Sequence, residues 1–314
     1  MFKSKYDFVK NIKIPFAIYA VVIVLAIIFG IINGGVNLDI NFKGGSRFTY
    51  TYEGDVDVNA VKDSVTKALD KEITVTQSSS ISGDSTKLVI SLVKDESLST
   101  ELQQKITDTL QKDYKDNNFI LGDSTTVSPS VAGSFFAKSL FAVLVAAILV
   151  IIYVGIRFKK IGGVSAALTA LAALVLDIIA AFAACTIFNL QIDTNFMAVI
   201  LTILGYSLND TIVIYDRIRE NRKFYPSETL YDVVNTSLFQ TMRRNIFTTA
   251  TTTIAIVTII VVSELAGLTA LRTFAIPMVF GIVSGCFSSM CVSGPLWVMW
   301  KKRLDARVKK SKKR

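Results

Sequence analysis

The sequence contains no histidine among its 314 residues. Histidine is the only side chain whose ordinary pKa lies between pH 5 and 8, and it is the commonest metal ligand in proteins. Its absence excludes a histidine metal site and leaves carboxylates as the groups for proton transfer near neutral pH. We also expect neither a metal nor a cofactor.

Cysteine is also scarce. All three cysteines lie inside apolar segments, at positions Cys185, Cys286 and Cys291. A disulfide framework needs paired cysteines in a water-exposed region. The sequence therefore excludes such a framework for its polar part.

Charge is almost absent from six long stretches and dense between them. A soluble core would mix polar and apolar residues at a period of 3.6 or 2. A helix needs about 20 apolar residues to cross the hydrocarbon layer, where the backbone must be internally hydrogen-bonded. We expect an α-helical polytopic membrane protein with six transmembrane helices, at residues 15–33, 135–156, 162–188, 194–215, 247–266 and 273–300.

The first span, residues 15–33, follows a basic start and in this respect resembles a signal peptide. Its apolar run is longer than a signal-peptide core, and no A-x-A-like cleavage site follows it. We expect an uncleaved membrane anchor.

Basic residues outnumber acidic ones by 34 to 25, which alone would be compatible with nucleic-acid binding. Most of them lie in four segments on one side of the six-span arrangement, namely 1–14, 157–160, 216–246 and 301–314. By the positive-inside rule, that side and both termini are cytoplasmic. The basic tail 301–314 fits a solvated anchor at an anionic lipid bilayer surface or a ribosome contact, and we expect no nucleic-acid partner.

Residues 34–134 are polar and lie on the other side, outside the cytoplasm, between spans 1 and 2. Alternating and amphipathic patterns predict the order βαββαβ, which is the ferredoxin-like α+β arrangement. The segments are a strand at 47–52, a helix at 57–69, strands at 73–76 and 88–93 separated by a turn at 82–85, a helix at 97–114, and a last strand at 119–121 or 125–127. Because this extracytoplasmic domain has no histidine, cysteine or glycine-rich phosphate loop, we expect a binding module.

The cytoplasmic loop 216–246 contains its own amphipathic pattern. A helix start at 226–228 is followed by apolar residues near helical spacing, at Leu230, Val233, Val234, Leu238 and Met242. Such a helix with basic ends is expected to lie at the membrane surface and cover the ends of spans 4 and 5.

Two carboxylates lie deep inside predicted spans, Asp177 in the third and Asp210 in the fourth. Ionisable groups at such depth are costly and mark pathways or relays. At about 1.5 Å per residue, Asp177 falls in the outer third of a core of about 30 Å and Asp210 in the inner third, about 16 Å apart in depth. We therefore do not expect the two carboxylates to touch.

Asp210 belongs to a polar helix face with Thr202, Tyr206 and Asn209, and Gly205 permits a close helix approach there. Arginines that can snorkel inward and a run of threonines begin the fifth span: Arg243, Arg244, Thr248, Thr249, Thr251, Thr252 and Thr253. Asp210 with an arginine can act as a proton site, because a moving guanidinium changes how tightly a buried carboxylate holds its proton. The same residues can equally form a static packing pair, and Asp177 can be a relay or a packing residue.

Four segments resemble the SecF family of protein-export membrane subunits. Residues 205–221 read GYSLNDTIVIYDRIREN and are similar to a long family signature. Residues 153–158 and 240–245 are similar to the family's YxxxRF and QT-x-x-R elements. Residues 38–45 are similar to its hydrophobic-Asp-Phe-x-Gly-Gly element, through Asp39, Phe42, Gly44 and Gly45, although Asn41 stands at the usual aspartate.

This resemblance implies a multi-pass subunit of the bacterial inner membrane within the RND permease superfamily. Such a subunit pairs with SecD, acts beside the SecYEG channel and uses the proton-motive force to assist late translocation of a secretory polypeptide. YajC-like or YidC-like membrane subunits are further expected partners. The family's proton-passage residues correspond to Asp210 and Arg244, with Asn209 beside them, and a further acid comes from SecD.

Two other functions fit parts of the pattern. An RND-type exporter of lipids or small molecules shares six spans and a proton-carrying aspartate, but it usually has two six-span halves and two large outer domains. An intramembrane aspartyl protease needs two carboxyls in one site. The expected depths of Asp177 and Asp210 oppose that arrangement, so no enzyme is expected.

Overall fold

The computed structural model describes residues 6–71, 73–79, 86–93, 100–265 and 271–311, with side chains up to residue 304 in the last range. Six helices in this part are long and apolar enough to cross a membrane. They are α1 (Lys13–Ile32), α5 (Pro129–Arg157), α6 (Gly163–Ile187), α7 (Thr194–Phe224), α8 (Leu230–Leu265) and the unit α9–η4–α10, with α9 at Arg272–Ser288, the π-helical turn η4 at Ser289–Ser293 and α10 at Gly294–Ser311. The expected fold class is confirmed.

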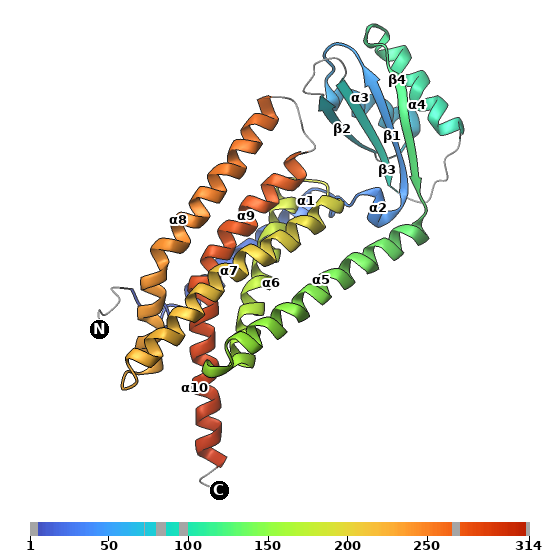
Figure 1. The fold of residues 1–314 in the computed structure, drawn as a ribbon. Helices are drawn as coiled ribbons and strands as arrows, with labels where there is room; N and C mark the ends of the chain where they lie inside the picture. Colours follow the sequence, from blue (N-terminus) through green and yellow to red (C-terminus); the bar gives the residue numbers. More distant parts are fainter. Residues whose placement is uncertain (1–5, 72, 80–85, 94–99, 266–270, 312–314) are drawn as a thin grey trace.

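The inserted α+β domain lies at one end of the helix bundle, whereas α10 ends at the opposite end (Figure 1). We call these ends the domain side and the terminal side. Helices α6 and α9 form the buried centre of the bundle, while α1, α5 and α8 expose most of their apolar residues outward. This distribution fits a protein whose outer surface meets lipid.

Small residues explain the close packing at the centre. Helix α6 buries a run of alanines, including Ala166, Ala170 and Ala173. A Cβ added at Gly163 would lie 2.1 Å from the carbonyl oxygen of Gly155, so this position of α6 touches the backbone of α5. Small side chains allow helix backbones to approach closely in a membrane.

The separate surface helix expected within 216–246 is not present. Helix α7 continues to Phe224 and α8 begins at Leu230, so only residues 225–229 connect them. Val233, Val234 and Leu238 belong to the buried core with Trp297 instead of facing lipid. The apolar face that the sequence predicts at the membrane surface is covered instead by the long α7 and α10.

The inserted domain has the expected order βαββαβ. Its elements are β1 (Gly45–Tyr52), α3 (Val58–Leu69), β2 (Ile73–Ser79), β3 (Thr86–Val93), α4 (Thr100–Asp113), the 3-10 turn η1 (Lys115–Asn117) and β4 (Ile120–Val127). The antiparallel sheet has the strand order β2-β3-β1-β4, and the two candidate segments for the last strand form one strand with an irregularity opposite Thr49 and Tyr50. The expected turn at 82–85 and residues 97–99 of the expected second helix lie outside the described residues.

Alternation along β1 places Phe48, Tyr50 and Tyr52 on the buried sheet face. Helices α3 and α4 pack on that face with Val61, Val65, Ile106 and Leu110 among others (Figure 1). The domain therefore has its own core. Its root, the short helix α2 (Ile40–Lys43), connects α1 to β1.

On the terminal side, the segment before α1 is tied to the start of α8. Asp7 accepts hydrogen bonds from Tyr231, from Nδ2 of Asn235 (3.0 Å) and from the backbone N–H of Lys10 (3.0 Å). Burial raises the pKa of the Asp7 carboxyl, but these hydrogen bonds and the Lys10 charge outweigh burial, so the net pKa is below its ordinary value.

Candidate functional site

Asp210 is a buried carboxylate near the middle of α7, with 2% of its surface exposed. Its Oδ2 atom has no hydrogen-bond partner in the described part of the chain. Buried polar atoms are almost always hydrogen-bonded, and exceptions mark a site for ordered water or a functional role. Asp210, which the sequence predicts to be buried, therefore has a carboxylate oxygen that no described residue binds.

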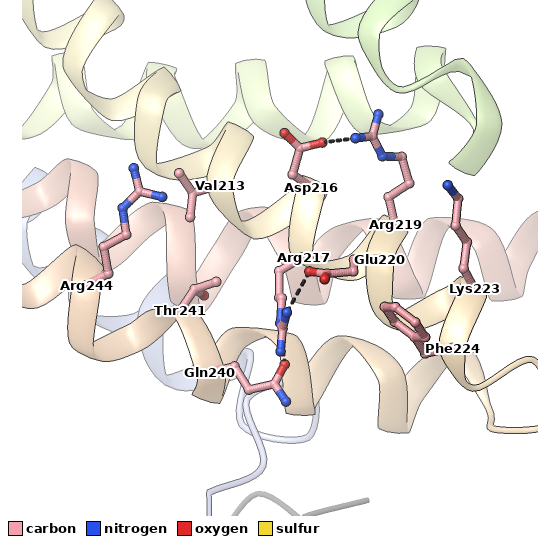
Figure 2. Close-up of a pocket in the computed structure, with 10 residues that line it drawn as sticks. All are labelled: Val213, Asp216, Arg217, Arg219, Glu220, Lys223, Phe224, Gln240, Thr241 and Arg244. Carbon is pink, nitrogen blue, oxygen red and sulfur yellow. Dashed lines mark hydrogen bonds and ion pairs between the residues drawn. The ribbon is translucent and has the colours of Figure 1, made fainter.

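Arg244, on α8, lies close enough to Asp210 to act on it electrostatically. The two side chains form no ion pair within the described ranges. Among the described residues Arg244 forms no ion pair, and it lines a hollow together with Val213, which Figure 2 draws beside it. Val213 is three residues beyond Asp210, so the arginine lies near the acid but is not bound to it.

Three further polar residues on α8 continue this region into the bundle. Asn245, Thr249 and Thr253 are spaced four residues apart, which places them on one helix face. Asn245 is fully buried and Thr249 is 6% exposed. Both side-chain polar atoms of Asn245 and both threonine hydroxyls are buried without a partner in the described structure. Ordered water commonly binds buried groups of this kind.

A hollow of about 640 Å³ opens between the terminal-side halves of α7 and α8. Its lining includes several charged residues, among them Arg217, Arg219, Glu220 and Lys223. Figure 2 shows that Arg217 pairs with Glu220 (2.6 Å), while Arg219 pairs with Asp216 (2.7 Å). Arg244 and Val213 line the same hollow, which therefore extends toward Asp210.

Asp177 is fully buried on α6 and accepts three hydroxyl hydrogen bonds. Its Oδ2 atom accepts from Ser207 (2.7 Å) and Ser288 (3.0 Å), and its Oδ1 atom accepts from Ser284 (2.7 Å). One carboxylate therefore connects α6, α7 and α9. No ion pair of Asp177 is present in the part of the chain that the structure describes.

The expected depth separation of about 16 Å between the two acids is wrong. Asp177 binds Ser207, which is three residues, or about 4.5 Å of helix rise, from Asp210. The depths were counted from opposite membrane edges, but α6 has 25 residues and α7 has 31, so both helices exceed the assumed 30 Å. The acids nevertheless share no hydrogen-bond donor among the described residues, unlike the paired acids of an aspartic protease.

The hydroxyl groups around Asp177 were missed at the sequence level. On the terminal side of Asp177, the hydroxyls of Thr211 and Ser289 are hydrogen-bonded (2.9 Å), and Ser293 donates to Tyr215 (2.9 Å). The π-helical turn η4 contains both serines, and such turns are frequent at functional sites. The four-residue spacing of serines in the last span was the available signal.

Helix α7 exposes a small polar stripe formed by Thr202, Gly205 and Asn209. A Cβ added at Gly205 would meet no atom within 4 Å. Behind the stripe, the Tyr206 hydroxyl donates to Thr252 (3.0 Å), and the Thr248 hydroxyl donates to its own helix backbone (2.8 Å). Polar surface within a span is costly toward lipid, so this face is suited to a protein partner.

The structure does not bring the four motif residues of the domain to the Asp210 site. Asp39, Phe42, Gly44 and Gly45 lie around α2, at the root of the inserted domain. Arg243 is also separate, with its guanidinium over the Phe247 ring at 5.6 Å.

Comparisons with known proteins agree on one family. Residues 105–303 match the family described as protein export membrane protein SecD/SecF, C-terminal. The SecF subunit of Sebaldella termitidis is 32% identical over 282 residues, covering 89% of this chain and 87% of that protein. The SecF subunit of Alicyclobacillus acidocaldarius is 40% identical over 181 residues, covering 57% and 56%.

Longer relatives contain a segment that is similar to this chain. The SecDF subunit of Bacillus subtilis is 32% identical over 96% of this chain, which spans 39% of that protein. The crystal structure of Thermus thermophilus SecDF, described as a translocon-associated membrane protein, has a TM-score of 0.75 and 27% identity, covering 95% of this chain and 39% of that one. The chain therefore belongs to the SecD/SecF family of protein-export membrane proteins, as a SecF-type translocase subunit.

Proposed function

We propose that this chain is the SecF half of a proton-driven export machine in the bacterial inner membrane. It pairs with a SecD-type partner and assists late translocation of secretory polypeptides through the SecYEG channel. The observation that carries this proposal is Asp210, a buried carboxylate whose Oδ2 atom has no partner among the described residues, beside Arg244, which forms no ion pair with them. In this orientation the terminal side is cytoplasmic, because the basic segments lie there.

Asp210 and Arg244 form the proton switch. When the guanidinium is close, it favours the carboxylate and the proton leaves. When α8 moves away from α7, the low dielectric favours the neutral acid, and Asp210 takes a proton from the opposite side. An arginine held near the acid without an ion pair is suited to both arrangements.

Water carries the released proton to the cytoplasm. The hollow between α7 and α8 is the cytoplasmic opening, and Arg244 lines it. Asn245, Thr249 and Thr253 follow along α8 as polar groups without a partner in the described part of the chain, and they hold ordered water beside Asp210. Asn209, exposed on the neighbouring face of α7, borders the same path.

The energy available is sufficient for such a switch. One charge that crosses 100 mV releases about 2.3 kcal/mol. At room temperature this free energy shifts a two-state equilibrium by about 50-fold. Asp177 supports the switch by holding α7 through Ser207, so that movement between α7 and α8 does not disturb the packing of α7 on α6.

The exposed stripe of Thr202, Gly205 and Asn209 is the SecD-facing surface. A stripe of small residues lets a neighbouring helix approach α7 closely and covers its polar groups. The SecDF relatives are consistent with this proposal, since their chains contain a further part that this chain does not span.

The test uses inverted membrane vesicles that contain the full chain, a SecD-type partner and the SecYEG channel. We expect completion of translocation to accelerate when a proton gradient is imposed, and to lose that acceleration when this chain is depleted. Copurification of the chain with SecD should weaken when Gly205 is replaced by leucine. Gradient-dependent acceleration that persists without the chain would contradict the proposal.

A further inference from the structure

The root of the inserted domain is joined to the loop that begins α7. The backbone N–H of Asp39 donates to the carbonyl of Ile192 (3.0 Å), and the N–H of Ile192 donates to the carbonyl of Asn37 (2.8 Å). Leu38 and Ile192 thereby form an isolated parallel β-bridge. The next residue, Asp193, caps α7 by accepting from the N–H of Asn195 (2.9 Å).

The Asp39 carboxylate strengthens this junction from three directions. It is 1% exposed and forms an ion pair with Arg47 of β1. It also accepts from Nε2 of Gln191 (3.5 Å), in the loop before α7, and from Nδ2 of Asn41 (2.7 Å), in α2. The sheet, the domain root and the α7 loop therefore share one buried carboxylate.

Asn41 stands where the family pattern has aspartate, and its amide suits this position beside Asp39. Its amide donates to Asp39, whereas an aspartate at position 41 would have no hydrogen to donate and would place a second negative charge beside Asp39. In this chain the acidic role of the motif therefore belongs to Asp39.

Close packing prevents the root from bending freely. Gly45 has φ +137°, and an added Cβ would lie 2.0 Å from the carbonyl oxygen of Leu92 in β3. The Phe42 ring packs against Phe135 and Phe136 of α5, with centroid separations of 5.6 and 5.8 Å. The domain root is thus held against both the sheet and α5.

We propose that Leu38, Asp39, Arg47, Gln191 and Ile192 form a clasp that transmits movement of α7 to the inserted domain. Asp210 lies 17 residues beyond Asp193, about 26 Å along the same helix, and a continuous helix carries a displacement over that distance. These five are positioning residues, and the clasp stays closed throughout the cycle. This inference rests on the proposed proton-driven function.

The experiment separates transmission from simple support by breaking the clasp and then restoring it with a covalent bond. Asp39→Ala removes the shared carboxylate. Leu38→Cys with Ile192→Cys can form a disulfide, because residues paired across a β-bridge have a Cα separation that a disulfide spans. The three native cysteines are replaced by alanine, and Leu38→Cys alone is the matched control. The readout is gradient-dependent translocation in the vesicles that also contain the SecD-type partner and the channel.

We expect Asp39→Ala to lower the gradient-dependent acceleration roughly fivefold or more, while translocation without a gradient is unchanged. Oxidation of the cysteine pair in the Asp39→Ala chain should restore the acceleration, and reduction should remove it again. The oxidised pair in a chain that retains Asp39 should be fully active.

Three results would overturn the clasp: full activity of Asp39→Ala, failure of the formed disulfide to restore activity, or loss of activity when the disulfide forms in a chain with Asp39. Each is interpreted only where Asp210→Asn abolishes the acceleration. If Asp210→Asn has no effect, the proposed function fails instead, and the two failures are therefore distinguishable.

Discussion

Gly285 of α9 is a contact point that holds α7, and its replacement by alanine gives a quantitative test of the packing around the candidate site. A Cβ at position 285 would lie 2.8 Å from Cβ and 3.0 Å from Oγ of Ser207. Carbon atoms prefer a separation of about 3.5 Å or more, so the helices must part by about 0.7 Å. Ser207 is the α7 residue that binds Asp177, at 2.7 Å.

The expected cost has two parts. Overpacking of a close contact costs about 1–3 kcal/mol, and the stretched Ser207–Asp177 hydrogen bond loses about 0.5–1.5 kcal/mol. We expect Gly285→Ala to lower the free energy of unfolding by about 2–4 kcal/mol. Gly205→Ala is the matched control, because a Cβ at position 205 meets no atom within 4 Å. It should stay within about 0.5 kcal/mol of the parent in detergent.

The assay is unfolding in mixed micelles of increasing dodecyl sulfate content. Tryptophan fluorescence reports it, because the chain has two tryptophans and Trp297 is buried in the bundle. If Gly285→Ala unfolds at the same dodecyl sulfate fraction as Gly205→Ala, the close α7–α9 contact and its link to Asp177 are refuted.

Three further predictions follow from the same structure. Asn245→Leu should keep or slightly raise the stability of the protein in mixed micelles, because it removes two buried polar atoms that have no partner in the described structure. The same variant should lower gradient-dependent translocation. A stable and fully active variant would refute the water path. Asp177→Leu should lower the free energy of unfolding by about 2–4 kcal/mol, because three buried hydroxyls lose their acceptor. Asp177→Asn should lower it by about half as much. Equal stabilities of the two variants would contradict the role of these hydrogen bonds. The folded pKa of Asp7 is lowered, so the stability that Asp7 contributes should be complete above about pH 4 and lost as the pH falls through the folded pKa. A fluorophore at position 6 should report release of the segment before α1 at acid pH in the parent but not in Asp7→Asn. Identical titrations of the two chains would contradict this.

The inserted domain was readable from sequence because each of its elements has one buried face. Phe48, Tyr50 and Tyr52 alternate as a strand requires, and Val61 and Val65 repeat as a helix requires. The six spans were readable because lipid demands long apolar helices. Local pattern and solvent determine these features, so no knowledge of the neighbours was needed.

The predictions that failed concern residues that are surrounded by neighbouring helices and not by lipid or water. Val233 and Leu238 resemble a membrane-facing helix, but they face protein, and periodicity alone does not distinguish the two environments. The depths of Asp177 and Asp210 failed because helix length and tilt depend on packing. The hydroxyls on Asp177 come from residues 30 to 111 positions away, a proximity that only the folded chain creates.

Part of the Asp210 site could be predicted from the sequence. The sequence predicted a buried acid with an arginine within reach, and it left a proton site and a static pair open. The absence of an ion pair between Asp210 and Arg244 in the described structure favours the switch that we propose. Asn245 escaped notice because an isolated asparagine carries no periodic signal, and its unpartnered atoms become visible only in three dimensions.

The most direct test of the account is gradient-dependent translocation by Asp210→Asn, measured in vesicles with the SecD-type partner and the channel. The control is Glu264→Gln, which neutralises an exposed carboxylate on α8 that does not line the hollow. Both variants should insert and copurify with the partner. We predict that Asp210→Asn completes translocation at one rate with or without a proton gradient, while Glu264→Gln keeps the parent's acceleration. Acceleration of Asp210→Asn equal to that of Glu264→Gln would contradict the account.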